Sequence, residues 1–184
     1  MIMVLAFSPI YLIIFILCFL ESGRPLFIQE RIGKHGKPFK LIKFRTMRIQ
    51  KDNDSEDTNR ITKLGKLLRI TSLDEIPSIY NIIKGDMSIV GPRPLLAEYL
   101  DLYSDTQKKR HDVKPGITGL AQIKGRNKLK WKERFEIDVW YVENQNFLLD
   151  LKIVFLTIFK VFKINDNQHD YDTTMYKFKG GDDE

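Results

Sequence analysis

The sequence predicts an α+β fold that is mainly helical and begins with a membrane helix. Three observations support this: the first 20 residues are apolar and uncharged, residues 24–48 alternate short apolar and basic stretches, and later segments repeat apolar residues at helical spacing. A chain of 184 residues, 43% of them hydrophobic, is long enough for one packed domain beside that helix. We expect a re-entrant or kinked membrane helix, a small strand hairpin and amphipathic interfacial helices.

The N-terminal segment has the length and composition of a membrane element. As a helix, residues 1–20 would extend about 30 Å, the hydrocarbon thickness of a bilayer. They lack the basic start and the small-residue cleavage site of a signal peptide. Nine basic residues and one acidic residue follow between positions 24 and 51, so the positive-inside rule places the rest of the chain in the cytoplasm. This predicts a membrane segment over 1–22, a cytoplasmic catalytic domain over 23–163 and a polar, acidic tail over 164–184.

Ser8-Pro9 interrupts the membrane segment. Proline removes a backbone donor and clashes with the preceding turn, which kinks or breaks a helix. One possibility is a kinked helix that crosses the bilayer, and the other is a re-entrant hairpin that turns back at Ser8-Pro9. Because membrane helices often carry proline, the residues alone favour the kink.

The remaining elements follow in order along the chain. Residues 24–48 fit a hairpin with its turn at Gly33 and Gly36, and 50–60 fit a solvated loop. Residues 61–84 fit a helix that breaks near Thr71-Ser72 and ends at Gly85. We then expect, in sequence, a short strand between two loops over 85–94, a helix over 95–111, an extended, turn-rich segment over 113–127, and helices over 129–143 and 147–163.

The last predicted helix has an unusual distribution of charge. Its apolar residues cover most of the circumference, and three lysines fall in one stripe: Lys152, Lys160 and Lys163. Such lysines can reach lipid headgroups while aromatic and aliphatic residues enter the acyl boundary, here Phe155, Ile158, Phe159 and Phe162. An ordinary core helix with a solvated lysine edge fits the pattern equally well.

Charge and the rarer residue types restrict the chemistry. The tail after Lys163 holds six of the 24 acidic residues and two of the 30 basic ones, so the body before it carries +10. That balance attracts nucleic acid, anionic lipid or phosphorylated small molecules. Cys18 is the only cysteine and lies in the apolar segment, and the three histidines are far apart, so we expect any metal to be held by oxygen ligands.

The adjacent carboxylates of Asp74 and Glu75 are the leading candidates for catalysis. Basic residues flank them in the sequence at Arg69, Lys84 and Arg93. Two neighbouring carboxylates can share a Mg²⁺ ion, and one of them can act as a nucleophile.

A purely structural role for this pair is also possible. Ser72-x-x-Glu75 has the spacing of a capping box, and Pro77 suits the first turn of a helix. The two roles are compatible, because a helix N-terminus also accepts an anionic phosphate.

Two further segments could bind phosphate. Pro92 and Pro94 restrict the backbone around Arg93, which positions its guanidinium for bidentate binding, although a rigid surface turn would have the same sequence. The glycines of the segment 113–127 permit close approach of the backbone to a ligand, and Arg126 follows them. Neither segment has the spacing of a dinucleotide fingerprint or a P-loop.

Several ordered motifs together resemble a known family. They are FKLIKFRTM at 39–47, SLDEIPSIYNIIKGDMSIVGPRPLL at 72–96 and KPGITGLAQIKGRN at 114–127, with Ser8-Pro9 in the apolar segment. The chain is similar, from about Phe7 to Lys163, to the bacterial sugar transferases, the monotopic polyprenol-phosphate phosphoglycosyl transferases. It resembles most the small members of the PglC type, which consist of the catalytic domain alone.

This resemblance implies a reaction and a place in the cell. The family transfers a phosphosugar from a UDP-sugar to undecaprenyl phosphate and releases UMP, as the first membrane step of glycoconjugate and polysaccharide assembly. The implied location is the cytoplasmic face of the bacterial inner membrane, in contact with membrane lipid and without a nucleic-acid partner. The family's membrane element is a re-entrant helix broken at Ser-Pro, so the resemblance favours the hairpin over the kink.

The resemblance also implies roles for individual residues. Asp74 would be the nucleophile that forms an aspartyl-phosphosugar intermediate, and Glu75 would act with it in binding Mg²⁺. The implied substrate-binding residues are Lys43, Arg45, Arg69, Pro92, Arg93, Pro94 and Arg126. The physics agrees, since an ionised carboxylate approaches a pyrophosphate only where cations screen the repulsion.

Two other functions fit the residues. A membrane-tethered basic module could bind anionic lipid or nucleic acid without catalysis, and the positive charge of the body would suffice for it. A phosphohydrolase could use the same Asp74-Glu75 pair with water as the acceptor. No motif in the sequence identifies the sugar.

Overall fold

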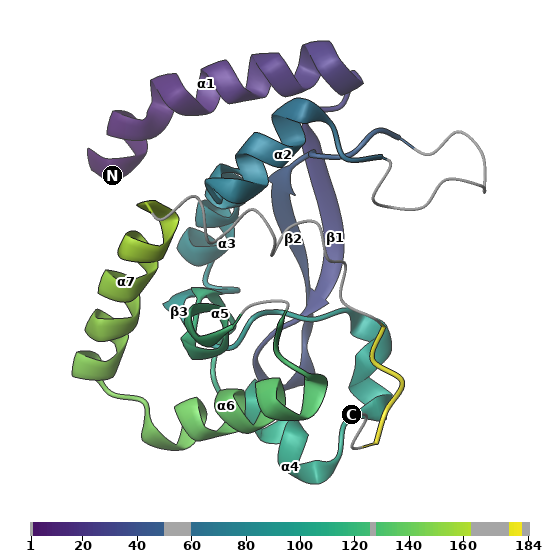
Figure 1. The fold of residues 1–184 in the computed structure, drawn as a ribbon, viewed down its shortest axis with the longest axis vertical. Helices are drawn as coiled ribbons and strands as arrows, with labels where there is room; N and C mark the ends of the chain where they lie inside the picture. Colours follow the sequence, from purple (N-terminus) through teal and green to yellow (C-terminus); the bar gives the residue numbers. More distant parts are fainter. Residues whose placement is uncertain (1, 50–59, 126–127, 163–176, 182–184) are drawn as a thin grey trace.

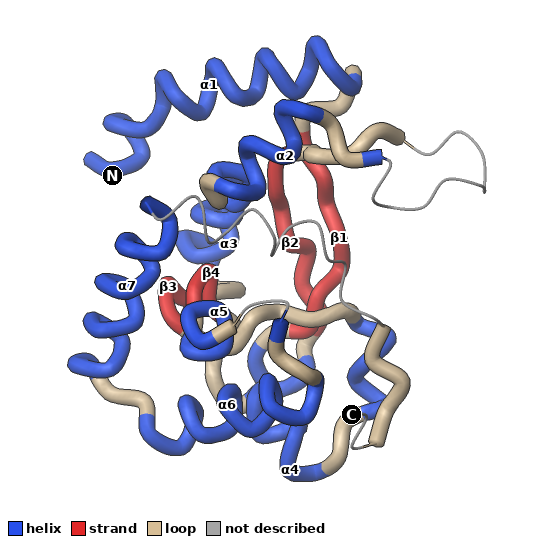
Figure 2. The backbone as a smooth tube through the Cα atoms, viewed as in Figure 1, coloured by secondary structure: helices blue, strands red, loops and turns tan. Residues whose placement is uncertain are grey.

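A long hairpin forms the centre of the molecule and helices surround it (Figure 1). The computed structural model describes residues 2–49, 60–125, 128–162 and 177–181. Figure 2 shows helix at both ends of the hairpin and along one side of it. Most of the predicted loop over 50–60 lies outside the described residues.

The hairpin consists of β1 (Leu26–Ile32) and β2 (Pro38–Phe44). The strands are antiparallel, with Leu26 opposite Phe44 and Ile32 opposite Pro38. A short 3₁₀ turn, η1 (Lys34–Gly36), joins them, and Gly36 has a φ of +72° that glycine adopts without strain. The hairpin that the alternating apolar and basic stretches predict is confirmed.

The helical segment after the hairpin breaks where the sequence predicts. It consists of α2 (Lys63–Ile70), the 3₁₀ helix η3 (Leu73–Ser78) and α3 (Ile79–Lys84). Ser72, between α2 and η3, has a φ of 58°, which no α-helix tolerates. Gly85 ends α3 in the left-handed conformation.

A second, parallel pair of strands crosses beside the hairpin. It consists of β3 (Ser88–Val90) and β4 (Gly116–Thr118), so the predicted short strand is confirmed. The prediction of an extended segment over 113–127 is wrong for α5 (Leu120–Lys124), which is helical. Ala121 of α5 is buried with Leu129 and with Ile137 of the helix that follows, and this packing outweighs the local glycine content.

The single helix predicted over 95–111 is wrong. The segment contains three short pieces: η4 (Ala97–Leu102), α4 (Asp105–Lys108) and η5 (Lys109–His111). The side chain of Ser104 accepts from the backbone N–H of Gln107, the third residue of α4, and the side-chain oxygen of Gln107 accepts from the backbone N–H of Ser104, which completes a capping box. A strong cap in the middle of the segment therefore starts a new helix.

The two remaining helices form one end and one side of the molecule. α6 (Trp131–Asn144) and α7 (Phe147–Phe162) match the predicted helices closely. α7 buries Ile153 completely, whereas Phe155 and Phe159 are 59% and 53% exposed. α7 therefore has one face in the core and one apolar face that is exposed, and its interfacial role stays a prediction.

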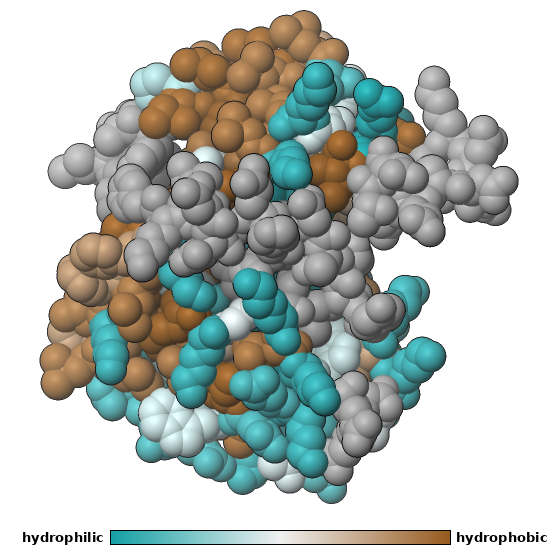
Figure 3. All heavy atoms as spheres, in the orientation of Figure 1, coloured by the Kyte–Doolittle hydropathy of each residue, from teal (hydrophilic) through white to brown (hydrophobic). Residues whose placement is uncertain are grey.

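The N-terminal segment forms α1 (Ile2–Ser22), which contains Pro9 and lies across one end of the hairpin (Figure 1). The structure does not confirm a re-entrant turn at Ser8-Pro9. In the parts of the chain that the structure describes, no helix has the length and apolar character needed to cross a membrane. Figure 3 shows apolar surface over α1 and along α7.

Part of the predicted tail belongs to the core. Phe178 is 3% exposed and packs in an aromatic cluster with Tyr99, Tyr103 and Phe135. Its ring centroid lies 5.0 Å from that of Phe135. The tail is therefore anchored at this point, although its composition predicts only a polar, acidic segment.

Candidate active site

Side chains of η3 and α3 fix these helices along the outer edge of β2. Ser78 Oγ donates to the carbonyl oxygen of Ile42 at 2.8 Å. The Asn81 side chain donates to the carbonyl of Lys40 at 2.8 Å and accepts from the N–H of Ile42 at 3.2 Å. Ser78 and Asn81 are each 1% exposed. These bonds satisfy an otherwise unpaired strand edge and place the start of η3 beside the end of β2.

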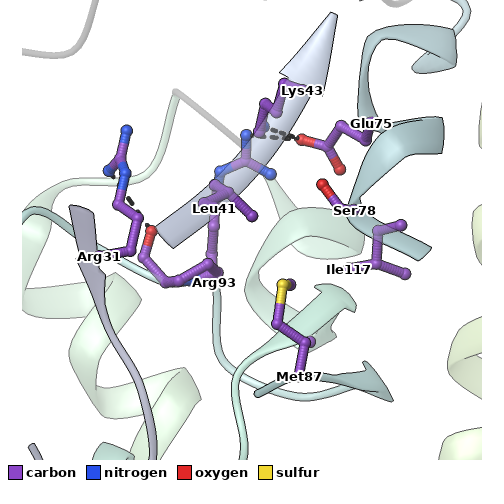
Figure 4. A pocket seen from close by; sticks show the side chains of 10 residues that line it. Arg31, Leu41, Lys43, Glu75, Ser78, Met87, Arg93 and Ile117 are labelled. Carbon is purple, nitrogen blue, oxygen red and sulfur yellow. Dashed lines mark hydrogen bonds and ion pairs between the residues drawn. The ribbon is translucent and has the colours of Figure 1, made fainter. Parts of the chain in front are cut away.

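Glu75 is the meeting point of two cations (Figure 4). Its Oε1 accepts from Lys43 Nζ at 2.5 Å and from Arg93 Nη2 at 3.0 Å. Burial raises the pKa of Glu75, but the charges and hydrogen bonds of Lys43 and Arg93 outweigh it and lower the pKa to about 2. Glu75 is thus ionised at neutral pH and joins the strand to the Pro92–Pro94 turn.

The predicted capping box at Ser72 is wrong. Ser72 is in the left-handed region and its side chain makes no cap hydrogen bond. The Glu75 side chain binds Lys43 and Arg93 instead of the backbone at Ser72. Charge-assisted bonds to two cations are stronger than one neutral backbone bond, which explains the preference.

Asp74 differs from its neighbour in having no fixed partner. Among the described residues, its carboxylate makes no hydrogen bond or ion pair. Burial raises the pKa of Asp74 to about 6, against the lowering effect of Lys43, and the charge of Glu75 adds to the increase. The Asp74 oxygens are therefore available to a ligand.

The structure places the other predicted binding residues differently with respect to the cavity. Arg69 Nε donates to Thr46 Oγ1 at 2.9 Å, and the charge of Arg69 lowers the pKa of Asp74. Arg45 faces the start of β1, where it donates to the carbonyls of Arg24 and Leu26, so the structure does not bring it to the cavity beside Glu75.

Pro92 and Pro94 flank Arg93 as the sequence shows, and Pro94 lines the cavity together with Lys43, Glu75 and Arg93. Arg126 lies outside the described residues.

Two glycines position the Pro92–Pro94 turn, because each packs closely against the main chain of Gly91. A Cβ on Gly116 would lie 2.1 Å from Gly91 N, and a Cβ on Gly119 would lie 2.2 Å from Gly91 O. The absence of side chains at Gly116 and Gly119 thus lets β4 pack against the residue before Pro92. We expected these glycines to admit a ligand, and the structure gives them a packing role.

Arg31 also lines this cavity, although sequence reasoning missed it. Its Nη1 donates to the carbonyl of Pro94 at 3.4 Å, and its Nε is buried without a hydrogen-bond partner. Burial, with the nearby charge of Arg93, lowers the pKa of Arg31 to about 10. An arginine in a basic strand carries no sequence signal for this role, because many basic residues surround it in the chain.

The cavity suits a phosphorylated ligand that carries several negative charges. Cationic side chains from β1, β2 and the turn gather around one ionised carboxylate, and Asp74 adjoins them without a partner. Guanidinium groups bind phosphate oxygens in bidentate geometry. Within the described residues no cluster of three or more His, Cys, Asp or Glu side chains forms a metal cage.

Comparison with known proteins agrees with this chemistry. Residues 1–164 match the family model described as bacterial sugar transferase. The chain is 51% identical over 168 residues to an uncharacterized sugar transferase, EpsL, of Bacillus subtilis, a match that covers 89% of this chain and 83% of the relative.

Longer relatives carry the same region. A UDP-glucose:undecaprenyl-phosphate glucose-1-phosphate transferase of Klebsiella pneumoniae is 44% identical over 84% of this chain, which covers 36% of that protein. An undecaprenyl-phosphate galactose phosphotransferase of Salmonella typhimurium is 36% identical over 85% of this chain and 37% of its own length. These matches and the paired carboxylates among cations establish that the chain is an enzyme of the bacterial sugar transferase family.

Proposed function

We propose that this protein transfers a phosphosugar from a UDP-sugar to undecaprenyl phosphate and releases UMP. One observation carries the proposal: Asp74 presents an unpartnered carboxylate beside Glu75, whose charge Lys43 and Arg93 already balance. Relatives named for transfer of sugar phosphates to undecaprenyl phosphate support the choice of donor and acceptor.

The proposed reaction has two displacements at one phosphorus atom. An oxygen of Asp74 attacks the phosphorus that bears the sugar, and the bond to the bridging oxygen breaks so that UMP leaves. An oxygen of undecaprenyl phosphate then attacks the same phosphorus, and the Asp74 carboxylate leaves. The products are UMP and undecaprenyl diphosphate sugar, and Asp74 returns to its starting form.

Each cation near Asp74 has a separate task in this proposal. Arg93 is 39% exposed at its side chain and can exchange part of its contact with Glu75 for a phosphate oxygen. Lys43, 18% exposed, keeps Glu75 in place and adds positive charge where the phosphoryl group passes. Arg69 and Arg31 add charge from α2 and β1.

The donor set also fits Mg²⁺. The free carboxylate of Asp74 and the second oxygen of Glu75 are hard oxygen ligands, and Mg²⁺ typically takes one or two carboxylates with substrate phosphates. When bound, the ion would neutralise charge on the donor's pyrophosphate. We propose Asp74 and Glu75 as the residues that hold it.

We further propose that the enzyme works at the cytoplasmic face of the bacterial inner membrane. The apolar surfaces of α1 and α7 would contact lipid, where a polyprenol acceptor resides. Basic residues near these surfaces would attract anionic headgroups.

A donor-only experiment tests the covalent step. Purified enzyme is mixed with a panel of UDP-sugars without any acceptor, and UMP is measured at early times. We expect release of UMP up to one equivalent per enzyme, with label from the sugar phosphate attached to the protein. Asp74→Asn should abolish both the release and the attachment of label.

Two results would contradict the proposal. If UMP appeared only after undecaprenyl phosphate was added, the two substrates would react in one step without an intermediate. If Asp74→Asn kept the covalent label, another residue would be the nucleophile. Continuous UMP release without acceptor, with free sugar phosphate as product, would indicate the phosphohydrolase alternative.

A further inference from the structure

The turn that carries Arg93 is held almost entirely through its carbonyl oxygens. Pro92 and Pro94 have no N–H group, so main-chain donors from the turn are few. The carbonyl of Pro92 accepts from the N–H of Gly116 at 3.0 Å, and the carbonyl of Leu95 accepts from the N–H of Ile32 at 3.1 Å. Two different strands therefore secure the ends of the turn.

Side chains of two arginines bind the carbonyls between these ends. Arg110 Nη2 donates to the carbonyl of Arg93 at 2.8 Å, and Arg31 Nη1 donates to that of Pro94 at 3.4 Å. Arg31 also faces the cavity, whereas the side chain of Arg110 is 1% exposed and does not line it. Arg110 thus contacts the main chain of Arg93 on the side away from the cavity.

Asp138 on α6 fixes the orientation of Arg110. Asp138 Oδ2 accepts from Arg110 Nη2 at 2.8 Å and from Nε at 3.2 Å, and the Asp138 side chain is 3% exposed. The guanidinium carbon also lies 5.6 Å from the ring centre of Phe135 and 5.9 Å from that of Tyr103. The ion pair and the two rings thus fix the plane of the guanidinium, and Nη2, which binds Asp138, also donates to the Arg93 carbonyl.

We propose that Arg110, oriented by Asp138, is a positioning residue that sets the direction of Arg93 toward the donor's phosphates. Arg110 holds the Arg93 carbonyl from outside the cavity, whereas Arg31, which holds the Pro94 carbonyl, lines it. Loss of this bond would free the peptide after Arg93 to rotate, and the guanidinium would reach Glu75 and the phosphates less often. The inference rests on the proposed function, because it takes Arg93 to bind the donor.

A double-mutant cycle separates positioning from general stability. Arg110→Lys keeps the charge but cannot bind both Asp138 and the Arg93 carbonyl with one planar fork. The measured quantity is kcat/KM for the UDP-sugar that gives UMP release. We expect Arg110→Lys to lower kcat/KM about tenfold in the natural background. In an Arg93→Lys background the loss should be less than twofold, because position 93 then has no guanidinium for Arg110 to position.

A second variant distinguishes a loss of positioning from a loss of folding. The double substitution Arg110→Met, Asp138→Leu removes both partners of the buried ion pair together, so neither partner is left facing an apolar replacement, while the buried Arg134, whose charge also acts on Asp138, is unchanged. It also removes the bond to the Arg93 carbonyl. We expect its melting temperature to be higher than that of Arg110→Met alone, and we expect the same background-dependent loss of kcat/KM.

Tyr141→Phe is the matched control. It removes a 2.7 Å bond from Tyr141 to Asp150 between α6 and α7 and touches no atom of the turn. Any activity change from Tyr141→Phe should be the same factor in both backgrounds. If Arg110→Lys and Arg110→Met, Asp138→Leu also gave equal factors in both backgrounds, Arg110 would be structural and the positioning role would be refuted.

Results that refute the proposed function would differ from results that refute the positioning role of Arg110. If Arg93→Lys alone left kcat/KM unchanged, Arg93 would not bind the donor, and the assumption beneath the inference would be the one refuted. If Asp74→Asn kept full activity, the nucleophile assignment would fail, while the cycle between Arg93 and Arg110 would still report on their coupling.

Discussion

Lys43 Nζ lies 2.5 Å from Glu75 Oε1, and this contact joins the end of β2 to the first turn of η3. The two residues are 32 positions apart in the chain. Ser78 and Asn81 hold η3 and α3 against β2, so the pair forms from a fixed backbone. The contact leaves Asp74 as the carboxylate without a partner.

The first prediction concerns this pair. Glu75→Gln keeps the shape of the side chain but removes the charge that Lys43 and Arg93 share, so both cations lose their fixed position. We expect kcat for UMP release to fall about 100-fold. Glu98→Gln is a suitable control, since Glu98 is 55% exposed at its side chain and does not line the cavity. Equal, small losses in both variants would show that Glu75 has no role in the reaction.

The second prediction concerns the fork of Arg93. Arg93→Lys keeps a positive charge but cannot make a bidentate contact with phosphate. We expect KM for the UDP-sugar to rise and kcat/KM to fall at least about tenfold. Arg48→Lys makes the same chemical change at an exposed position away from the cavity and should be silent. If Arg93→Lys left KM and kcat/KM unchanged, Arg93 would have only a structural role in the turn.

The third prediction concerns stability against pH. Burial and the charge of Arg110 lower the pKa of His111 to about 4, whereas an unfolded histidine has a pKa near 6.5. As the pH falls through 6.5, the unfolded chain gains a proton that the folded chain does not accept until about pH 4. The free energy of unfolding should therefore decrease by about 2 kcal/mol between pH 7 and pH 5 from this group.

Urea unfolding at both pH values measures this effect. His111→Gln has no group that titrates in the window, so its free energy of unfolding should decrease less over the same interval. Equal decreases in the two proteins would assign the pH dependence to other residues.

Sequence reasoning succeeded where local signals were strong. Gly33 and Gly36 between alternating stretches predict the hairpin turn, and β-branched and aromatic residues suit its strands. The break near Thr71-Ser72 and the stop at Gly85 are also local, because one residue in the left-handed region ends each helix.

Predictions from the sequence were wrong where packing between distant residues or an unexpected helix cap determined the structure. α5 forms because Ala121 packs with Leu129 and Ile137, and the capping box at Ser104 divides a segment with helical periodicity. No pattern in the chain links Arg31 to Pro94, 63 residues away, or Arg110 to the carbonyl of Arg93. The predicted nucleophile and its neighbour needed a family resemblance, since adjacent carboxylates equally fit a helix cap.

The fourth prediction concerns the anchored tail. Phe178→Ala removes a buried ring from the cluster around Tyr103 and Phe135, which should cost about 3 kcal/mol. The melting temperature should fall by roughly 10 °C. Phe147→Ala removes a ring that is 77% exposed and should change little. A stable Phe178→Ala protein would show that the tail does not contribute to the core.

The last prediction concerns the exposed face of α7. The rings of Phe155 and Phe159 lie with their centroids 4.5 Å apart on this face. If the face enters the acyl boundary, a fluorescent dye on Phe159→Cys should be quenched by vesicles whose acyl chains carry bromine. Cys18→Ser in the same protein keeps the label at one position.

Lys132→Cys on α6 provides the matched label, because Lys132 is exposed but lies on a helix with a polar outer surface. We expect its dye to respond to aqueous iodide and not to brominated lipid. A dye on Lys152→Cys should give an intermediate result, since lysines of the α7 stripe would lie at the headgroups. If the dyes on α6 and α7 responded alike to both quenchers, α7 would face water, and its apolar surface would need a protein partner instead of lipid.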